Sequence, residues 1–323
     1  MKAIRFAKTG GPEVLSLQDV ELPPPGPGQV RVRHGAVGLN FIDTYHRSGL
    51  YPVALPSGLG MEAAGTVEAV GENVASLRRG DRVGYCTGPI GAYAEANNVP
   101  ADRVVKLPTA ISDEVAAAAM LKGMTAQYLL KQTFKVEAGQ TILFHSAAGG
   151  VGLIAGQWAK HLGATVIGTV GSDDKIDLAK AHGCDHVLNL RMDEWVAKVR
   201  ELTRGEGVPV VYDSVGKDTF AGSLDCLAVR GMMVSFGNSS GAMPPFEPAV
   251  LSAKGSLYLT RPTLFHYART SQELQAMADD LFAVIASGAV KIVINQRFAL
   301  KDARAAHEAL HGRKTTGATV LIP

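Results

Sequence analysis

Cysteine is scarce in this sequence. Only three of the 323 residues are cysteines, Cys86, Cys184 and Cys226. They are too few and too scattered for a disulfide framework or a four-cysteine zinc site. The sequence also lacks an apolar run of membrane-spanning length, and residues 1–6 are too polar for the apolar core of a signal peptide. We therefore expect a soluble, cytoplasmic protein with no membrane partner.

An excess of charge of one sign is missing as well. The formal net charge is +2 and no basic run stands out. Strong binding to nucleic acid phosphates depends on clustered Lys and Arg, so we expect no nucleic-acid partner. Hydrophobic residues, by contrast, make up 46% of the chain. Material for a core is plentiful, and the length suits two domains.

The sequence offers little support for hydrolytic or metal chemistry. One H-E-x-x-H motif occurs at residues 307–311, where two imidazoles on one helix face could hold zinc beside Glu308 as a general base. Only a dozen residues follow it, and none is a His or Glu that would supply a third ligand. We expect an amphipathic surface helix here and no bound metal.

The clearest pattern is a strand, turn, helix and strand over residues 141–170. Residues 141–144 are β-branched or aromatic, and apolar residues recur at three- and four-residue steps from Val151 to Leu162, as on one face of a helix. The turn between them fits G-x-G-x-x-G, with Ala147, Gly149 and Gly152 at the glycine positions. A pyrophosphate can approach such a turn and bind the helix N-terminus. The sequence therefore predicts a dinucleotide-binding unit, with an ordinary α/β turn as the alternative.

The end of the second strand indicates which dinucleotide is bound. An NAD-binding unit usually has Asp or Glu about 20 residues beyond the turn, to bond the ribose 2′-hydroxyl. Here that place is Gly171, which leaves room for a 2′-phosphate, and Ser172 and Lys175 follow. Asp173 and Asp174 complicate this choice, because a one-residue slip would put a carboxylate near the ribose. The register of strand 165–170 favours NADPH over NADH.

The rest of the chain falls into two regions. Up to about residue 120, short β-rich runs alternate with Gly- and Pro-rich turns, which suggests a partly open β-barrel. After a helix at 111–130, strands and helices alternate to about residue 260, which predicts a mostly parallel, doubly wound sheet. A helix is expected near 193–202 and strands at 232–236 and 256–260. The tail from 261 onward is expected to pack back on the N-terminal barrel.

Several stretches together resemble one family, the NADPH-dependent quinone oxidoreductases, which form the zeta-crystallin-like branch of the medium-chain dehydrogenase/reductase superfamily. The resemblance extends from the first strand to the last. It rests on residues 11–15, 40–45 with 47–49, 80–83, 147–152, 211–216 and 235–241.

The resemblance implies an α/β architecture of two domains. A GroES-like catalytic domain, a partly open β-barrel, would comprise residues 1–123 and 262–323, and a Rossmann domain that binds NADPH would comprise residues 124–261. The usual assembly in the family is a homodimer joined through the Rossmann domains.

The resemblance also assigns site residues. It implies that Asn40 and Tyr45 line the nicotinamide end, that Tyr51 borders the acceptor pocket, and that these three are the catalytic candidates. Thr125 would bond the carboxamide. The other cofactor residues would hold the pyrophosphate (Ala148, Gly149, Gly150, Val151, Gly152), read the 2′-phosphate (Gly171, Ser172, Lys175) or complete the cleft (Val215, Phe236, Gly237, Asn238, Ser239, Arg261, Arg313). One departure is Leu190, which follows Asn189 where the family often has an aromatic or imidazole side chain, so NADPH selectivity would depend more on Lys175.

The resemblance implies a zinc-free reaction. Zinc-dependent alcohol dehydrogenases of the superfamily carry Gly-His-Glu where this chain has Gly60, Met61 and Glu62, and a thioether does not replace imidazole as a zinc ligand there. Without a metal to polarise a carbonyl, alcohol oxidation would be slow, whereas a quinone is already electron-poor. We expect an NADPH:quinone reductase, acting by hydride or one-electron transfer. The alternatives are an NADPH-dependent enone or alkenal reductase and a nucleotide-binding protein with a structural or regulatory role.

Overall fold

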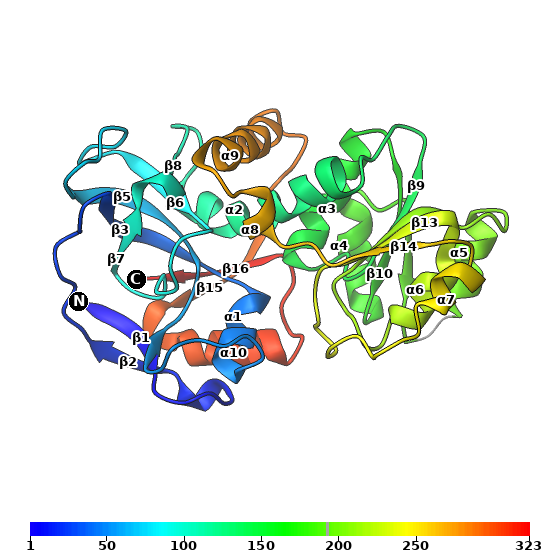
Figure 1. Ribbon diagram of the computed structural model, residues 1–323, viewed down its shortest axis with the longest axis horizontal. Helices are drawn as coiled ribbons and strands as arrows, with labels where there is room; N and C mark the ends of the chain where they lie inside the picture. Colours follow the sequence, from blue (N-terminus) through cyan, green and yellow to red (C-terminus); the bar gives the residue numbers. More distant parts are fainter. Residues whose placement is uncertain (192–193) are drawn as a thin grey trace. The chain divides into compact units, whose positions relative to one another are not determined.

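The computed structural model describes residues 1–191 and 194–323. Within them the chain divides into two compact units, which Figure 1 shows with the chain coloured along its length. Unit 1 contains Met1–Met124, Ala268–Ala286 and Ile292–Pro323, and unit 2 contains Thr125–Tyr267 and Ser287–Lys291. No helix in the described part of the chain is long and apolar enough to cross a membrane.

Unit 2 is built on a six-stranded parallel sheet. Its strand order is β11-β10-β9-β12-β13-β14, so the order reverses between β9 and β12, as in a doubly wound sheet. This confirms the predicted architecture. The strands are β9 (Thr141–Phe144), β10 (Thr165–Val170), β11 (His186–Asn189), β12 (Val208–Asp213), β13 (Leu227–Ser235) and β14 (Tyr258–Thr260).

Helices follow most of these strands, and apolar side chains from strands and helices form one core, with Leu143, Ile167 and Val211 at its centre. The helices are η3 (Leu129–Thr133, a π-helix), α3 (Gly150–His161), η4 (Asp173–Lys175), α4 (Ile176–Ala181), α5 (Trp195–Leu202), α6 (Phe220–Cys226), α7 (Ala249–Ala253) and α8 (Leu264–Tyr267). The helix predicted near 193–202 is α5. Met192 and Asp193 lie outside the described residues. The strand predicted at 232–236 begins earlier, at Leu227, and the one predicted at 256–260 begins only at Tyr258.

Unit 1 contains two sheets. The smaller has the order β2-β1-β4, and the larger the order β15-β16-β3-β5-β6-β8, with β7 also paired to β3. The strands are β1 (Lys2–Phe6), β2 (Ser16–Asp19), β3 (Gln29–Leu39), β4 (Ser57–Gly58), β5 (Glu62–Val70), β6 (Arg82–Tyr85), β7 (Ala96–Pro100), β8 (Val105–Lys106), β15 (Ile294–Ala299) and β16 (Ala318–Ile322). Because β16 pairs with β3, the tail packs back on the N-terminal strands as predicted.

The helices of unit 1 are short except for two. They are η1 (Pro12–Val14), α1 (Phe41–Ser48), η2 (Ala101–Arg103), α9 (Ser271–Ala286), η5 (Leu300–Asp302) and α10 (Ala303–His311), and α2 (Asp113–Tyr128) begins in unit 1 and ends in unit 2. Strand β2 begins only at Ser16, because Pro12 starts the short helix η1 just before it and proline favours a first helical position.

Candidate functional site

The turn between β9 and α3 is the first part of the predicted site. Ser146 has a φ of +56°, and its carbonyl oxygen would lie 2.3 Å from a Cβ at position 152, so only glycine fits there. The turn is tied to the sheet because the Ala147 N–H donates to the Thr169 carbonyl oxygen at 2.9 Å. Residues 147–152 therefore form the tight turn that the motif predicts.

The N-terminus of α3 gives this turn an affinity for anions. The Leu153 N–H donates to the Gly149 carbonyl oxygen, the first bond along the helix. The N–H groups of Gly150, Val151 and Gly152 come before this bond, in the first turn of α3, and have no acceptor within the helix. Together with the helix dipole, they favour a phosphate at this end.

The end of β10 holds the residues expected to read a 2′-phosphate. Gly171 and Ser172 follow the strand directly, and nothing lies within 4 Å of a Cβ built at Gly171. Asn189, at the end of the neighbouring strand β11, donates through Nδ2 to Oδ1 of Asp173 at 2.8 Å. One oxygen of the Asp173 carboxylate is therefore already bound by a side chain of the protein.

A buried carboxylate holds the loop after β12. Asp213 accepts the N–H groups of Val215 and Gly216 at 2.7 and 3.0 Å through Oδ1, and the hydroxyl groups of Thr219 and Ser223 through Oδ2. All four bonds go to a side chain with no exposed surface. Val215, a predicted cofactor residue, is therefore fixed at the carboxyl end of the sheet.

The loop after β13 lies against this one. A Cβ at Gly237 would lie 2.5 Å from the Ser214 carbonyl oxygen, so the two loops touch through backbone. Arg261, just after β14, donates to the Ser235 hydroxyl at 3.0 Å and to the Gly237 carbonyl oxygen at 2.9 Å. Unit 2 thus brings one predicted set together along the carboxyl ends of its strands: residues 148–152, 171–175, 215, 236–239 and 261.

The catalytic candidates of unit 1 lie in helix α1 and at its two ends. Asn40 is its N-cap, Tyr45 lies in its middle, and the Tyr51 N–H donates to the Tyr45 carbonyl oxygen at 3.1 Å. The rings of Tyr45 and Tyr51 meet edge to face, with centroids 5.1 Å apart. The structure therefore brings these three residues together.

Two buried carboxylates hold Asn40. Its backbone N–H donates to Oδ2 of Asp43 at 2.8 Å, and its side-chain Nδ2 donates to Oε2 of Glu62 at 2.8 Å. Glu62 also accepts the ammonium of Lys122 at 3.2 Å and the backbone N–H of Leu121 at 2.7 Å. Asn40 is itself 4% exposed.

Asp43 continues into a chain of buried polar groups. The Tyr93 hydroxyl donates to Asp43 at 2.9 Å and lies 3.1 Å from Nε2 of His307, whose Nδ1 lies 2.9 Å from Nη1 of Arg47. An arginine only donates, so Nδ1 accepts, and Nε2 carries the proton that it donates to Tyr93. Burial raises the pKa of Asp43 to about 7 and lowers that of His307 to about 3.

This chain accounts for the H-E-x-x-H motif. His307 is fully buried against Arg47 and Tyr93, whereas His311 is exposed and Glu308 pairs with Arg304 at 2.9 Å. The prediction of an amphipathic surface helix is correct for the exposed His311, but His307 is buried in the core. Among the residues that the structure describes, no group of three or more His, Cys, Asp and Glu side chains is placed to hold a metal.

Two predicted residues stand apart from these clusters. Thr125 is buried in α2 and belongs to unit 2, and Arg313 is exposed, follows α10 and belongs to unit 1. Their roles toward a cofactor stay predictions.

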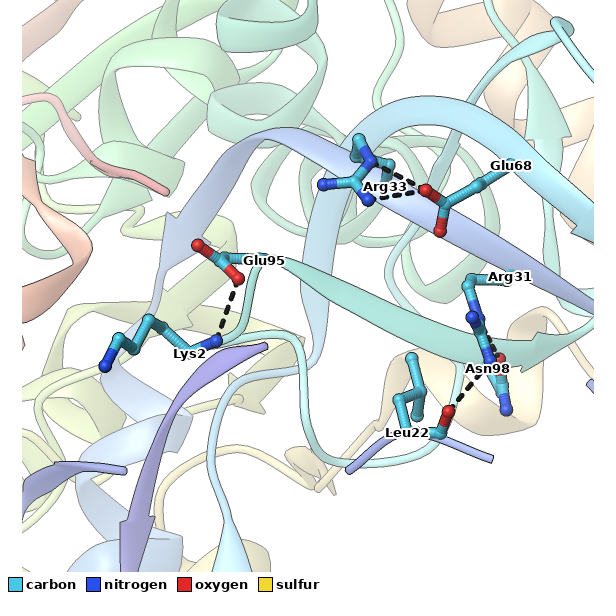
Figure 2. Close-up of polar contacts among 7 residues, drawn as sticks. All are labelled: Lys2, Leu22, Arg31, Arg33, Glu68, Glu95 and Asn98. Atoms are coloured by element: carbon cyan, nitrogen blue, oxygen red, sulfur yellow. Dashed lines mark hydrogen bonds and ion pairs between the residues drawn. The ribbon is translucent and has the colours of Figure 1, made fainter. Parts of the chain in front are cut away.

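Each unit also has a surface hollow away from the predicted residues. The one in unit 1, about 400 Å³, is lined by Arg31, Arg33, Glu68 and Glu95 among others. Figure 2 shows that both arginines are already engaged: Arg33 binds Glu68, and Arg31 binds Asn98 and the Leu22 carbonyl oxygen. The hollow in unit 2, about 300 Å³, lies at the β11 edge of the sheet.

Sequence reasoning gave no role to Lys122 or to the carboxylate of Glu62. The charged side chains of Glu62 and Lys122 are 60 positions apart, and Lys122 lies in an Ala-rich helix. The available signal was that Lys122 is the only charged residue from residue 115 to residue 126.

Comparison with known proteins identifies both halves of the chain. A family model described as zinc-binding dehydrogenase matches residues 150–283, and one described as alcohol dehydrogenase GroES-like domain matches residues 26–109. The second match agrees with the GroES-like domain expected for the N-terminal region.

Individual relatives cover the whole chain. A quinone oxidoreductase of Pseudomonas aeruginosa is 57% identical over 100% of this chain and 99% of its own. A 2-haloacrylate reductase of a Burkholderia species is 45% identical over 98% and 97%. The solved structure of Escherichia coli quinone oxidoreductase complexed with NADPH is 50% identical, covers 100% of both chains and has a TM-score of 0.99.

Proposed function

Because the chain belongs to the quinone oxidoreductases of the medium-chain dehydrogenase/reductase superfamily, we propose that it is an NADPH-dependent reductase of quinones. The observation that carries this proposal is the turn from Ser146 to Gly152, which aims the first N–H groups of α3 at the place of a pyrophosphate. Its relatives are named for quinone reduction, and one of them was solved with NADPH.

NADPH fits the end of β10 better than NADH does. The open space at Gly171 accommodates a 2′-phosphate, and Ser172 and Lys175 supply a hydroxyl and a cation. Asn189 binds Asp173, the carboxylate that would otherwise favour a ribose hydroxyl. In this proposal the preference for NADPH depends on Asp173, which is bound by Asn189, and on the positive charge of Lys175.

The two units have separate tasks in this proposal. Unit 2, with the predicted domain 124–261, holds the cofactor through residues 148–152, Thr125, Val215, the loop at 236–239 and Arg261. In unit 1, with the predicted domain 1–123 and 262–323, Asn40, Tyr45 and Tyr51 are the catalytic candidates, and Arg313 is a further cofactor candidate.

Bound NADPH would supply reducing electrons to the acceptor, as a hydride or in one-electron steps. The protein has to orient the two partners and exclude water, and the paired rings of Tyr45 and Tyr51 provide an apolar surface for a flat acceptor. Met61, 5% exposed, stands where zinc-dependent relatives carry a histidine, so the residues here favour an acceptor that needs no metal to be polarised.

Reduction of an activated carbon–carbon double bond is the second candidate. The 2-haloacrylate reductase, 45% identical, bears a name for that chemistry. A conjugated double bond, like a quinone, accepts a hydride without metal assistance, so the same residues serve both reactions.

One experiment separates the candidates: loss of the reduced-nicotinamide absorbance with 1,2- and 1,4-quinones and a conjugated enone side by side, with NADH as a control. We expect rapid, chelator-insensitive loss of NADPH with quinones. Faster turnover of the enone would move the assignment to alkene reduction. Tight NADPH binding without turnover of any acceptor would leave a nucleotide-binding protein.

We also propose a homodimer that forms through the edge of β14. Tyr258, on the edge strand β14, is 58% exposed, and Val229, on the adjacent strand β13, is 75% exposed. Large exposed apolar side chains at or beside a sheet edge favour a protein contact. A cytoplasmic location fits the three cysteines, which are all buried and unpaired.

A further inference from the structure

The core of unit 1 contains an ion pair that its fold does not require. Glu62 on β5 has no exposed side-chain surface, and Lys122 on α2 is 7% exposed, with 3.2 Å between Nζ and Oε2. Removing two charges from water costs several kcal/mol per ion, and apolar residues of similar volume often stabilise a core equally well. The presence of this pair therefore suggests a task other than stability.

The neighbouring strand is shaped around the carboxylate. Gly38 on β3 lies opposite Glu62 in the β-sheet register. A Cβ at Gly38 would lie 2.1 Å from Oε2 of Glu62 and 2.2 Å from the Ala117 carbonyl oxygen on α2. A side chain at this place would push the carboxylate away from its partners.

The partners of Glu62 lead to the predicted site. Oε1 accepts the Leu121 N–H at 2.7 Å, and Oε2 accepts both the ammonium of Lys122 and Nδ2 of Asn40. An ionised carboxylate can only accept hydrogen bonds. Asn40 must therefore turn its NH₂ group toward Glu62. Its Oδ1 faces the backbone N–H of Asp43 in the capping box of α1 and keeps a second lone pair for a donor from elsewhere.

The backbone of Asn40 is held just as firmly. Its N–H donates to Asp43 at 2.8 Å, so both the main chain and the side-chain amide end on buried carboxylates. Without the Glu62 carboxylate, the side-chain amide of Asn40 would lose the acceptor of its NH₂ group. Rotation of the amide would then place the NH₂ group where Oδ1 now stands.

We propose that Glu62 and Lys122 are the positioning pair of the nicotinamide end. Glu62 fixes the amide of Asn40 so that Oδ1 accepts an N–H of the cofactor's carboxamide, and Lys122 holds the Glu62 carboxylate in place through its 3.2 Å contact with Oε2. This inference rests on the proposed function, in which Asn40 lines the nicotinamide.

The first test compares stability with turnover in Glu62→Gln, Lys122→Met and the double variant. Each single variant leaves one buried charge unpaired, so its melting temperature falls. The double variant removes both charges and regains stability. Because it still lacks the carboxylate, we expect its kcat to stay about tenfold or more below that of the wild type.

Glu68→Gln is the matched control. Glu68 lies on the same strand and pairs with Arg33 at the surface, and Figure 2 shows this pair. We expect this variant to keep the wild-type melting temperature and kcat, because exposed pairs contribute little.

A binding measurement reads the nicotinamide end without turnover. Adenosine 2′,5′-bisphosphate contains the 2′-phosphate but no nicotinamide, so Glu62→Gln and the double variant should bind it as the wild type does. NADPH should lose about tenfold in affinity, and the enhancement of its nicotinamide fluorescence on binding should fall.

Two results would overturn the inference. One is a double variant that regains kcat together with its melting temperature, which would make the pair purely structural. The other is an unchanged ratio of NADPH to bisphosphate affinity in both Glu62 variants. A wild-type protein that binds NADPH but reduces no quinone would instead refute the proposed function, and the affinity ratio would still decide the role of Glu62.

Discussion

Lys175 is the side chain on which the proposed choice between NADPH and NADH depends most. It closes the short helix η4, which begins two residues after Gly171, while the neighbouring strand continues into Leu190, a residue that cannot donate a hydrogen bond. Asp173 would oppose a phosphate, but Asn189 binds it. A hydrogen bond from a cation to a phosphate typically contributes more binding free energy than one from a neutral donor.

Replacing Lys175 by Met should therefore weaken NADPH selectively. Hydrogen bonds to charged groups contribute about 1.5–3 kcal/mol, so we expect the KM for NADPH to rise by about tenfold or more while that for NADH is unchanged. Steady-state kinetics with both cofactors measure the effect. Lys180→Met, an exposed lysine on α4, is the control. Equal losses with the two cofactors would contradict a contact with the 2′-phosphate.

At the scale of elements, helix α10 is joined to α1 by a buried polar link. His307 on α10 binds Arg47 on α1, and the same imidazole reaches Tyr93 and, through it, Asp43. Burial and the Arg47 charge lower the pKa of His307 to about 3. The folded protein therefore keeps this imidazole neutral at pH values where the unfolded chain, with an ordinary pKa near 6.5, binds a proton.

His307 should make the protein sensitive to acid. Because its folded pKa is depressed, its contribution to stability is complete above about pH 6.5 and is lost as pH falls toward 3. The loss amounts to about 2 kcal/mol at pH 5. In urea unfolding at several pH values, His307→Gln should be less stable than the wild type at neutral pH but should lose less between pH 7.5 and 5.

The exposed His311 on the same helix provides the control, since His311→Gln should keep the wild-type slope. Asp43 has a raised pKa and contributes the opposite slope, but it does so in wild type and variant alike, so the difference isolates His307. Parallel slopes for wild type and His307→Gln would contradict the buried, neutral imidazole.

Elements and turns were predictable where their signal is local. The turn at 147–152 follows from glycine spacing between a strand and a helix, and the parallel direction of the strands follows from their alternation with helices. The contacts that hold Asn40 were not predictable. Asp43 is three residues from Asn40, but Glu62 is 22 residues from it, and Tyr93 is 50 residues from the Asp43 that it binds. No periodicity links a buried carboxylate to its partner. The bond from Asn189 to Asp173, 16 residues apart, was not predictable either, because no sequence pattern links the two residues.

At the scale of the whole molecule, the two edges of the sheet in unit 2 differ. β11 forms one edge, beside α5 and the surface hollow, and β14 forms the other. A strand at an edge offers backbone N–H and C=O groups to another chain unless it is covered. Two apolar side chains, Val229 and Tyr258, are largely exposed at the β14 edge, whereas Leu202 near the β11 edge is 38% exposed.

We expect two copies of the chain to pair through β14 and join their sheets. Carboxylates at the centre of that interface would have to be buried without a partner, so Val229→Asp combined with Tyr258→Asp should produce a monomer. Light scattering coupled to size-exclusion chromatography measures the mass directly, and the wild type should elute as a dimer. Leu202→Asp, at the opposite edge, should leave the dimer intact. A double variant that stays dimeric would place the interface elsewhere, and a wild type that is monomeric at micromolar concentration would leave β14 as an open edge that its short length protects.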